Sequence, residues 1–164
     1  MNNRLDITII YDNNPLQEDL QTDWGFSCLI EHGENTILFD TGDNGSILLD
    51  NMKKLSINPK KVDTVFLSHY HHDHTGGLKD FLKINSNIKI YYPQSFPNEV
   101  LDIFINSGSN NIPVSDFMEI LPGIYSLGEI HGKIPEQSMA IHTRKGLIII
   151  TGCAHPGIVN IIDK

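Results

Sequence analysis

A dense cluster of histidines is the part of this sequence best suited to chemistry. Four of the eight histidines and one aspartate fall within residues 69–74. Such imidazole-rich tracts are typical of transition-metal sites, because neutral imidazole nitrogens and carboxylate oxygens bind these ions directly. His69 and His71, two apart on extended backbone, project to the same side and can bind one cation. Asp73 and His74 fall on the turn that follows, so a second metal position can form beside the first.

The element that must hold these ligands is the apolar, β-branched run at residues 62–67, which predicts a buried strand. Ligands at the end of such a strand are held in place by the core behind them. The alternative is a solvated loop whose histidines bind nothing, and it describes one or two histidines better than a cluster of four. His72 is the exception within the cluster. Its neighbours point into the site, so we expect His72 to face outward and bind nothing.

Three segments of the chain resemble the metallo-β-lactamase superfamily. Residues 69–77, with the pattern His-x-His-x-Asp-His-Thr-Gly-Gly, are similar to its metal-binding signature, and residues 36–42 are similar to its strand that ends in an aspartate. Residues 146–160 resemble one branch, the metal-dependent hydrolases of β-lactamase superfamily II, which includes proteins similar to the archaeal dihydropterin-ribofuranosylaminobenzene phosphate synthase. The resemblance implies an α/β fold, the αβ/βα four-layer sandwich. It also implies that Asp40 supports the site by hydrogen bonding.

The remaining ligands are expected near the late apolar strand. Where many relatives carry an aspartate at the end of that strand, this chain has Cys153. Cys153 could be a thiolate ligand or a small buried thiol. His155, between a buried strand and a helix start, is the stronger candidate metal ligand. Glu136 lies in a Glu-Gln-Ser segment similar to that of the branch and is a candidate oxygen ligand or substrate contact. His131 is the other candidate for the separate histidine that many relatives carry.

The chain stops at Lys164, soon after Pro156, which suits the first position of a helix. The resembled family continues with further strands and a last histidine ligand. We therefore expect residues 1–164 to form one domain that is incomplete at its C-terminus. A shortened protein, a fragment and a layer supplied by a partner chain remain open alternatives. The second metal position is expected to be weakened or lost.

The imidazole-rich ligand set favours one or two zinc ions as the cofactor, while iron or manganese would suit the added carboxylate. A metal bound by His69, His71 and His155 would lower the pKa of a coordinated water from ~15.7 toward ~7 and so create a nucleophile. Asp73 would orient that water and accept its proton. The resemblance and this chemistry predict a metal-dependent hydrolase acting on an ester, thioester, lactone or phosphoester.

Two other functions stay open. The resembled synthase suggests a transferase that condenses a dihydropterin pyrophosphate with an arylamine-type nucleophile. A non-catalytic metal-binding remnant is the third alternative. Metal analysis together with a substrate panel would separate the three.

Charge and composition limit the kinds of partner that the chain is expected to bind. The net charge of −8 argues against nonspecific binding of nucleic acid, which depends on clustered lysines and arginines. We expect a small-molecule substrate, with a second copy of the chain as another candidate partner. Two cysteines indicate no disulfide framework, and no apolar run reaches the ~20 residues that cross a bilayer. The expected location is therefore the cytoplasm.

The hydrophobic pattern predicts the other elements less evenly. Residues 93–120 contain prolines, asparagines and serines and receive no firm assignment, apart from a short helix over residues 100–105. Two strands are expected before the second metal loop. The remaining predicted elements are strands at 7–10 and 88–92, a hairpin of 26–30 with 36–39, a helix at 46–55 and a helix that begins at 78.

Overall fold

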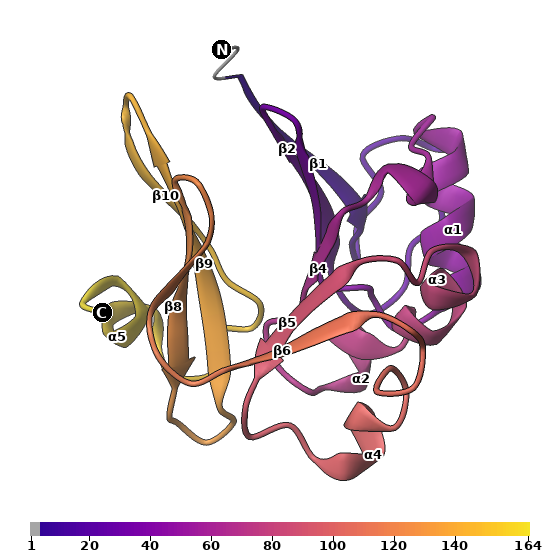
Figure 1. Ribbon diagram of the computed structural model, residues 1–164. Coiled ribbons are helices and arrows are strands. Elements are labelled where there is room, and N and C mark those ends of the chain that lie inside the picture. The colour runs from indigo at the N-terminus through magenta and orange to yellow at the C-terminus, as the bar shows by residue number, and fades with distance from the viewer. Residues whose placement is uncertain (1–3) are drawn as a thin grey trace.

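Two β-sheets lie face to face with helices on their outer sides in the computed structural model, which describes residues 4–164 (Figure 1). Three apolar clusters fill the spaces between these layers. One lies between the first sheet and its helices, one lies between the two sheets, and a smaller one lies between the second sheet and the last helix. The layers are therefore helix, sheet, sheet and helix, which confirms the predicted αβ/βα sandwich.

The first sheet has six strands in the order β1-β2-β3-β4-β5-β6. Strands β1 to β3 are antiparallel neighbours, whereas β3 to β6 are parallel. The parallel strands β3, β4 and β5 are mostly buried, which explains why they read as apolar, β-branched runs. The strands are β1 (Leu5–Tyr11), β2 (Ser27–His32), β3 (Asn35–Phe39), β4 (Thr64–Phe66), β5 (Lys89–Pro93) and β6 (Asn110–Val114).

The second sheet has four antiparallel strands in the order β10-β9-β8-β7. Its inner face packs against the first sheet through side chains such as Met139, Ile141 and Ile124. The strands are β7 (Met118–Leu121), β8 (Ile124–Ile130), β9 (Glu136–Thr143) and β10 (Gly146–Ile150).

Short helices cover the outer faces of both sheets (Figure 1). In α1, Leu48 and Met52 lie on one face and enter the core of the first sheet, as expected for an amphipathic helix. Asn44 caps this helix by accepting a hydrogen bond from the Ser46 N–H. The helices are α1 (Gly45–Lys54), η1 (Pro59–Lys61), α2 (His72–Thr75), α3 (Leu78–Ile84), α4 (Asn98–Leu101) and α5 (Ile158–Ile162). No helix within residues 4–164 is both long and apolar enough to span a membrane.

The structure corrects the sequence predictions in three places. Residues 93–120 hold strands β6 and β7 besides α4, and three strands rather than two precede the second metal loop. Strand β6 escaped recognition because Asn110, Asn111 and Pro113 are poor strand formers, yet an edge strand tolerates them. Pro156 is not the first residue of α5, which begins at Ile158 after a left-handed Gly157.

One buried glutamine ties the two sheets together beside the metal loop. The Gln137 side-chain N–H donates to the carbonyl oxygen of Leu67 at 2.8 Å, and its backbone N–H donates to that of Ser68 at 2.9 Å. Its side-chain oxygen accepts a hydrogen bond from the hydroxyl of Ser126 at 2.8 Å. The loop that follows β4 is therefore fastened to β9 across the interior.

Replacing Gln137 with leucine is expected to lower the free energy of unfolding by about 2–4 kcal/mol, because the Leu67 carbonyl and the Ser126 hydroxyl lose buried partners. Urea unfolding followed by circular dichroism would measure the change. Gln94→Leu is the matched control, since Gln94 is exposed and should change stability by less than about 0.5 kcal/mol. Equal stabilities of the two variants would contradict the cross-sheet role of Gln137.

Candidate metal centre

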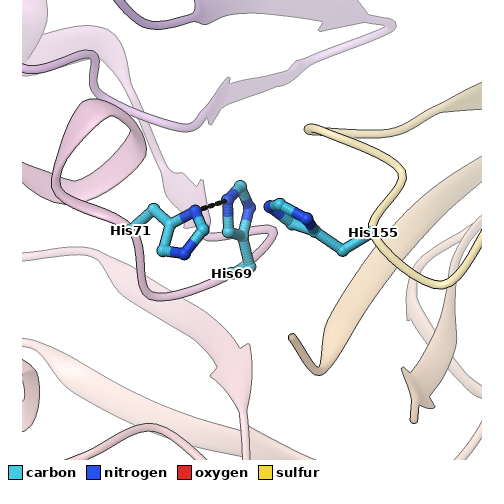
Figure 2. A group of neighbouring side chains, drawn as sticks. All are labelled: His69, His71 and His155. Carbon is cyan, nitrogen blue, oxygen red and sulfur yellow. Dashed lines mark hydrogen bonds between the residues drawn. The ribbon is translucent and has the colours of Figure 1, made fainter. Parts of the chain in front are cut away.

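Loops from three strand ends meet at one edge of the two sheets. Strand β3 ends just before Asp40, β4 leads into the loop with His69, and β10 leads into the loop with His155. Figure 2 shows the ring of His69 between those of His71 and His155, with the three rings close together. The folding of two distant segments onto this edge thus brings together histidines that are more than eighty residues apart in the sequence.

The first ligand group consists of His69, His71 and His155, whose candidate ligand atoms all lie within 4.8 Å of one another. The Nε2 atom of His69 lies 3.1 Å from Nδ1 of His71. The ring of His155 stands 4.8 Å from each of the other two rings, centre to centre. Three convergent imidazoles are a common ligand set for zinc in catalytic sites.

The position of the proton on the His69 ring suits a metal ligand. The single hydroxyl hydrogen of Ser68 is donated to Asp40 Oδ2 at 2.7 Å, so Ser68 Oγ accepts the Nδ1–H of His69 at 2.9 Å. The Nε2 atom of His69 then keeps a free lone pair directed toward the other imidazoles. Burial, and after it the nearby His74, lower the pKa of His69 to about 2, so its ring is neutral at neutral pH.

His155 provides the test of whether these residues fit a metal ion. Among residues 4–164, its Nε2 is the one buried side-chain nitrogen or oxygen atom that lacks a hydrogen-bond partner. A buried polar atom without a partner is costly, and a metal ion at this centre would satisfy it. Burial and the neighbouring His155 also lower the pKa of His71, which favours the neutral imidazole that binds metals. The donor set therefore fits a transition metal.

A second ligand group consists of His69, His74 and Cys153, so the two groups share His69. The Sγ atom of Cys153 lies 3.2 Å from Nε2 of His74, and Oδ2 of Asp73 lies 3.5 Å from the same nitrogen. Burial, followed by the charge of Asp73, raises the pKa of the Cys153 thiol to about 11. A bound cation would oppose these effects, because a coordinated thiol is deprotonated.

Asp40 supports the site from behind, as the family resemblance implied. Its fully buried carboxylate accepts hydrogen bonds from the Ser68 N–H, the Ser68 hydroxyl and Nδ1 of His74, at 2.7, 2.7 and 2.6 Å. Burial raises the pKa of Asp40. Burial alone would lower the pKa of His74, but the hydrogen bond and charge of Asp40 raise it. The carboxylate thus orients Nε2 of His74 toward Cys153.

Asp40 and Ala154 both have left-handed backbone conformations, with φ of 54° each. Such values are uncommon for residues other than glycine and are concentrated at functional sites. Each residue follows the end of a strand that leads to the centre, β3 for Asp40 and β10 for Ala154. The turns bring the Asp40 carboxylate and the loop of His155 toward the same point.

Glu136 lies under the loop that carries His155 and belongs to neither ligand group. Its Oε1 accepts hydrogen bonds from the Thr151 hydroxyl and the Ala154 N–H at 2.8 and 3.1 Å. Its Oε2 accepts the His155 N–H at 2.9 Å. The carboxylate therefore holds the backbone of this loop in place.

The other candidate histidines lie outside both groups. The His72 side chain is exposed, as expected, and its Nδ1 lies 2.7 Å from Asp43 Oδ1. His131 is also exposed, and its Nδ1 lies 3.6 Å from Oε1 of Glu129. Ser68 connects Asp40 to His69 but was not predicted as a site residue. Its position directly before the first histidine, at the end of a buried strand, is the signal that could have revealed it.

Zinc is expected to protect Cys153 from alkylation if Cys153 is a ligand. In a Cys28→Ser variant the exposed Cys153 is the remaining thiol, and iodoacetamide labelling can be followed by mass spectrometry. Labelling should slow by at least about tenfold when zinc is bound, because the metal occupies the sulfur lone pair. An unchanged labelling rate in protein shown to contain zinc would contradict the ligand role of Cys153.

Comparisons with known proteins agree with this fold. Residues 25–137 match the family model described as "Metallo-beta-lactamase superfamily". The chain is 36% identical, over 188 aligned positions, to 7,8-dihydropterin-6-methyl-4-(beta-D-ribofuranosyl)-aminobenzene-5'-phosphate synthase of Methanocaldococcus jannaschii. That alignment covers 85% of this chain and 64% of the synthase, so the chain spans less than two thirds of the relative's length.

Two solved structures share the fold at low sequence identity. The metallo-beta-lactamase fold protein YhfI from Bacillus subtilis matches with a TM-score of 0.64 and 18% identity, covering 91% of this chain and 62% of that protein. An N-acyl homoserine lactone hydrolase, with its product bound at the catalytic metal centre, matches with a TM-score of 0.63 and 19% identity. The match covers 90% of this chain and 74% of that protein. The family model matches more than half of the residues of this chain, and the chain therefore belongs to the metallo-β-lactamase superfamily.

Proposed function

We propose that this chain is a metal-dependent hydrolase, in which a zinc-activated water would attack an ester, thioester, lactone or phosphoester. The observation that carries the proposal is the convergence of His69, His71 and His155 with a buried, unpartnered Nε2 on His155. Three imidazoles at one centre are suited to zinc, whereas the nearby carboxylate of Asp73 would also suit iron or manganese.

Different residues of the site are proposed to bind the metal, to accept the proton and to position the ligands. His69, His71 and His155 hold the ion, which when bound supplies a Lewis acid and lowers the pKa of water toward ~7. Asp73 lies at the edge of the site, with Oδ2 3.5 Å from His74 Nε2, and is the residue that orients the attacking water and accepts its proton. Asp40 keeps His74 in position through its 2.6 Å hydrogen bond.

A second candidate function follows from the comparison with the archaeal synthase, to which the chain is 36% identical. In this alternative the same centre promotes a condensation, in which an arylamine-type nucleophile displaces pyrophosphate from a dihydropterin pyrophosphate. The carbon–nitrogen bond forms as the carbon–oxygen bond to pyrophosphate breaks, and the amine loses a proton. Asp73 would then accept the proton of the amine rather than that of water.

A direct test begins by counting metals in protein purified without added metal. The zinc-loaded protein is then assayed on p-nitrophenyl esters and phosphodiesters and, in parallel, on a dihydropterin pyrophosphate with an arylamine. Hydrolysis that is lost with a chelator and restored by zinc would support the hydrolase. Condensation without hydrolysis would favour the transferase. Stoichiometric zinc with neither activity would overturn both and favour a non-catalytic metal-binding remnant.

A further inference from the structure

A pocket of about 270 Å³ opens beside the second ligand group. Its walls include Asp73, His74 and Cys153 on the side of the metal centre and Trp24 on the side of the loop that precedes β2. A molecule in this pocket would therefore touch the residues of the site directly. Pockets that combine an aromatic wall with a few polar groups are the usual form of a small-molecule site.

Trp24 is the only tryptophan of the chain, and its side chain is largely exposed, at 70%. Its backbone, in contrast, is fixed on both sides. The Trp24 N–H donates to Asp23 Oδ1 at 2.8 Å, and the N–H of Gly25 donates to Asn13 Oδ1 at 2.9 Å. A largely exposed indole on an anchored backbone forgoes apolar burial and leaves much of its surface available to a ligand.

The loop of Trp24 is also joined to the metal loop. The N–H of Phe26 donates to the carbonyl oxygen of Asp73 at 3.2 Å. Gly25 has a φ of +132°, and a side chain there would collide with the same carbonyl oxygen. This close approach sets the position of Trp24 relative to Asp73. The aromatic wall and the proposed proton acceptor are thus parts of one local structure.

The polar side chains of the pocket indicate which kind of ring can lie on the indole of Trp24. Asp12 and Asp73 both line it, and no lysine or arginine lines it. A ring that carries N–H donors would therefore find carboxylate acceptors at the pocket wall. Stacking of a planar ring on an aromatic side chain contributes about 1–3 kcal/mol.

We propose that Trp24 is a stacking platform that binds a planar aromatic or heteroaromatic part of the substrate beside Asp73 and Cys153. The proposal rests on the proposed function in that it names the class of substrate the same centre takes. It makes Trp24 a specificity-determining residue, because substrates without a planar group gain nothing from the indole.

Binding can be measured without turnover, since Trp24 is the only tryptophan and its fluorescence reports directly on a stacked ligand. Zinc-loaded protein is titrated with 2-naphthamide and with its saturated counterpart, decahydro-2-naphthamide. We expect 2-naphthamide to quench the fluorescence and to bind at least about fivefold more tightly than the saturated compound. Calorimetry then gives the dissociation constants for variants that lack the indole.

Trp24→Ala is expected to weaken the binding of 2-naphthamide about tenfold and to leave the decahydro compound unchanged, while Trp24→Phe should stay within about threefold of the original protein. The matched control is Phe117→Ala, which removes another exposed aromatic ring that stacks on Tyr125, away from the pocket. Zinc content and unfolding temperature should be the same in all of these proteins. Equal affinity for the planar and saturated amides, or no loss in Trp24→Ala, would overturn the platform.

The outcome is separable from that of the proposed function. If no ester, phosphodiester or pterin substrate is turned over but 2-naphthamide still depends on Trp24, the hydrolase assignment fails and the platform stands. If turnover depends on zinc but Trp24→Ala changes neither the binding of 2-naphthamide nor KM for naphthyl esters, the platform fails and the hydrolase stands.

Discussion

Replacing His69 with alanine is expected to abolish tight zinc binding altogether, because its imidazole belongs to both ligand groups. Replacing His155 should remove only the first group and leave the second, with His74 and Cys153, able to bind. Loss of a supporting group typically lowers metal affinity 10–100-fold, so loss of a ligand should lower it by at least about 100-fold. Zinc per chain and zinc affinity, measured by mass spectrometry and by competition with a chelator, would show the difference.

His72→Ala is the control for both variants, since His72 lies in the same cluster but is exposed and pairs with Asp43. It should bind as much zinc as the original protein. Hydrolytic turnover, where present, should fall with zinc in His69→Ala and His155→Ala and persist in His72→Ala. Unchanged zinc stoichiometry and affinity in His69→Ala would refute the shared-ligand arrangement.

Removal of the Asp40 side chain should damage both stability and metal binding. Asp40→Ala leaves the Ser68 N–H, the Ser68 hydroxyl and Nδ1 of His74 without their buried acceptor. Breaking a buried charged network of this kind costs about 3–5 kcal/mol. Urea unfolding of the metal-free protein would measure the loss, and zinc affinity should fall as well because His74 is no longer oriented.

The control for this variant is Asp43→Ala, which removes a carboxylate close in sequence whose partner is the exposed His72. An exposed ion pair contributes about 0–1 kcal/mol, so this variant should remain nearly as stable as the original protein. A loss below about 1 kcal/mol in Asp40→Ala would show that the buried network contributes little, contrary to the geometry.

Much of the candidate site was visible in the residue types themselves. A run with four histidines at strand-end spacing predicted that His69 and His71 share a centre, and the structure places their ring nitrogens 3.1 Å apart. The partner from the distant loop, His155, was predicted from its setting between a strand and a helix. The hydrogen bonds of Glu136 could not be predicted, because they depend on how the β10 loop folds over β9.

The fold was predictable where the hydrophobic pattern was strong. The hairpin of β2 and β3 and the helix α1 agree with the pattern because their apolar residues follow the period of the element and face a core. Strand β6 was missed because Asn110, Asn111 and Pro113 have weak intrinsic preference for strands, and β7 was missed because four residues are too few to show a period. Their pairing with β5 and β8 stabilises them instead, and such pairing is a property of the assembled sheets.

The sequence by itself determined the chemistry of the donors, since imidazole, carboxylate and thiol groups are properties of residue types. The layered α/β architecture was implied by the resemblance of three segments to a known superfamily. Only the tertiary structure decided which donors meet. The cross-sheet bonds of Gln137 hold the β4 loop against β9, and those of Glu136 hold the loop of His155 beside it. Distances between such loops arise from the packing of two sheets, which no local pattern records. For the same reason Trp24 became visible as the wall of a pocket only once its loop lay against Asp73.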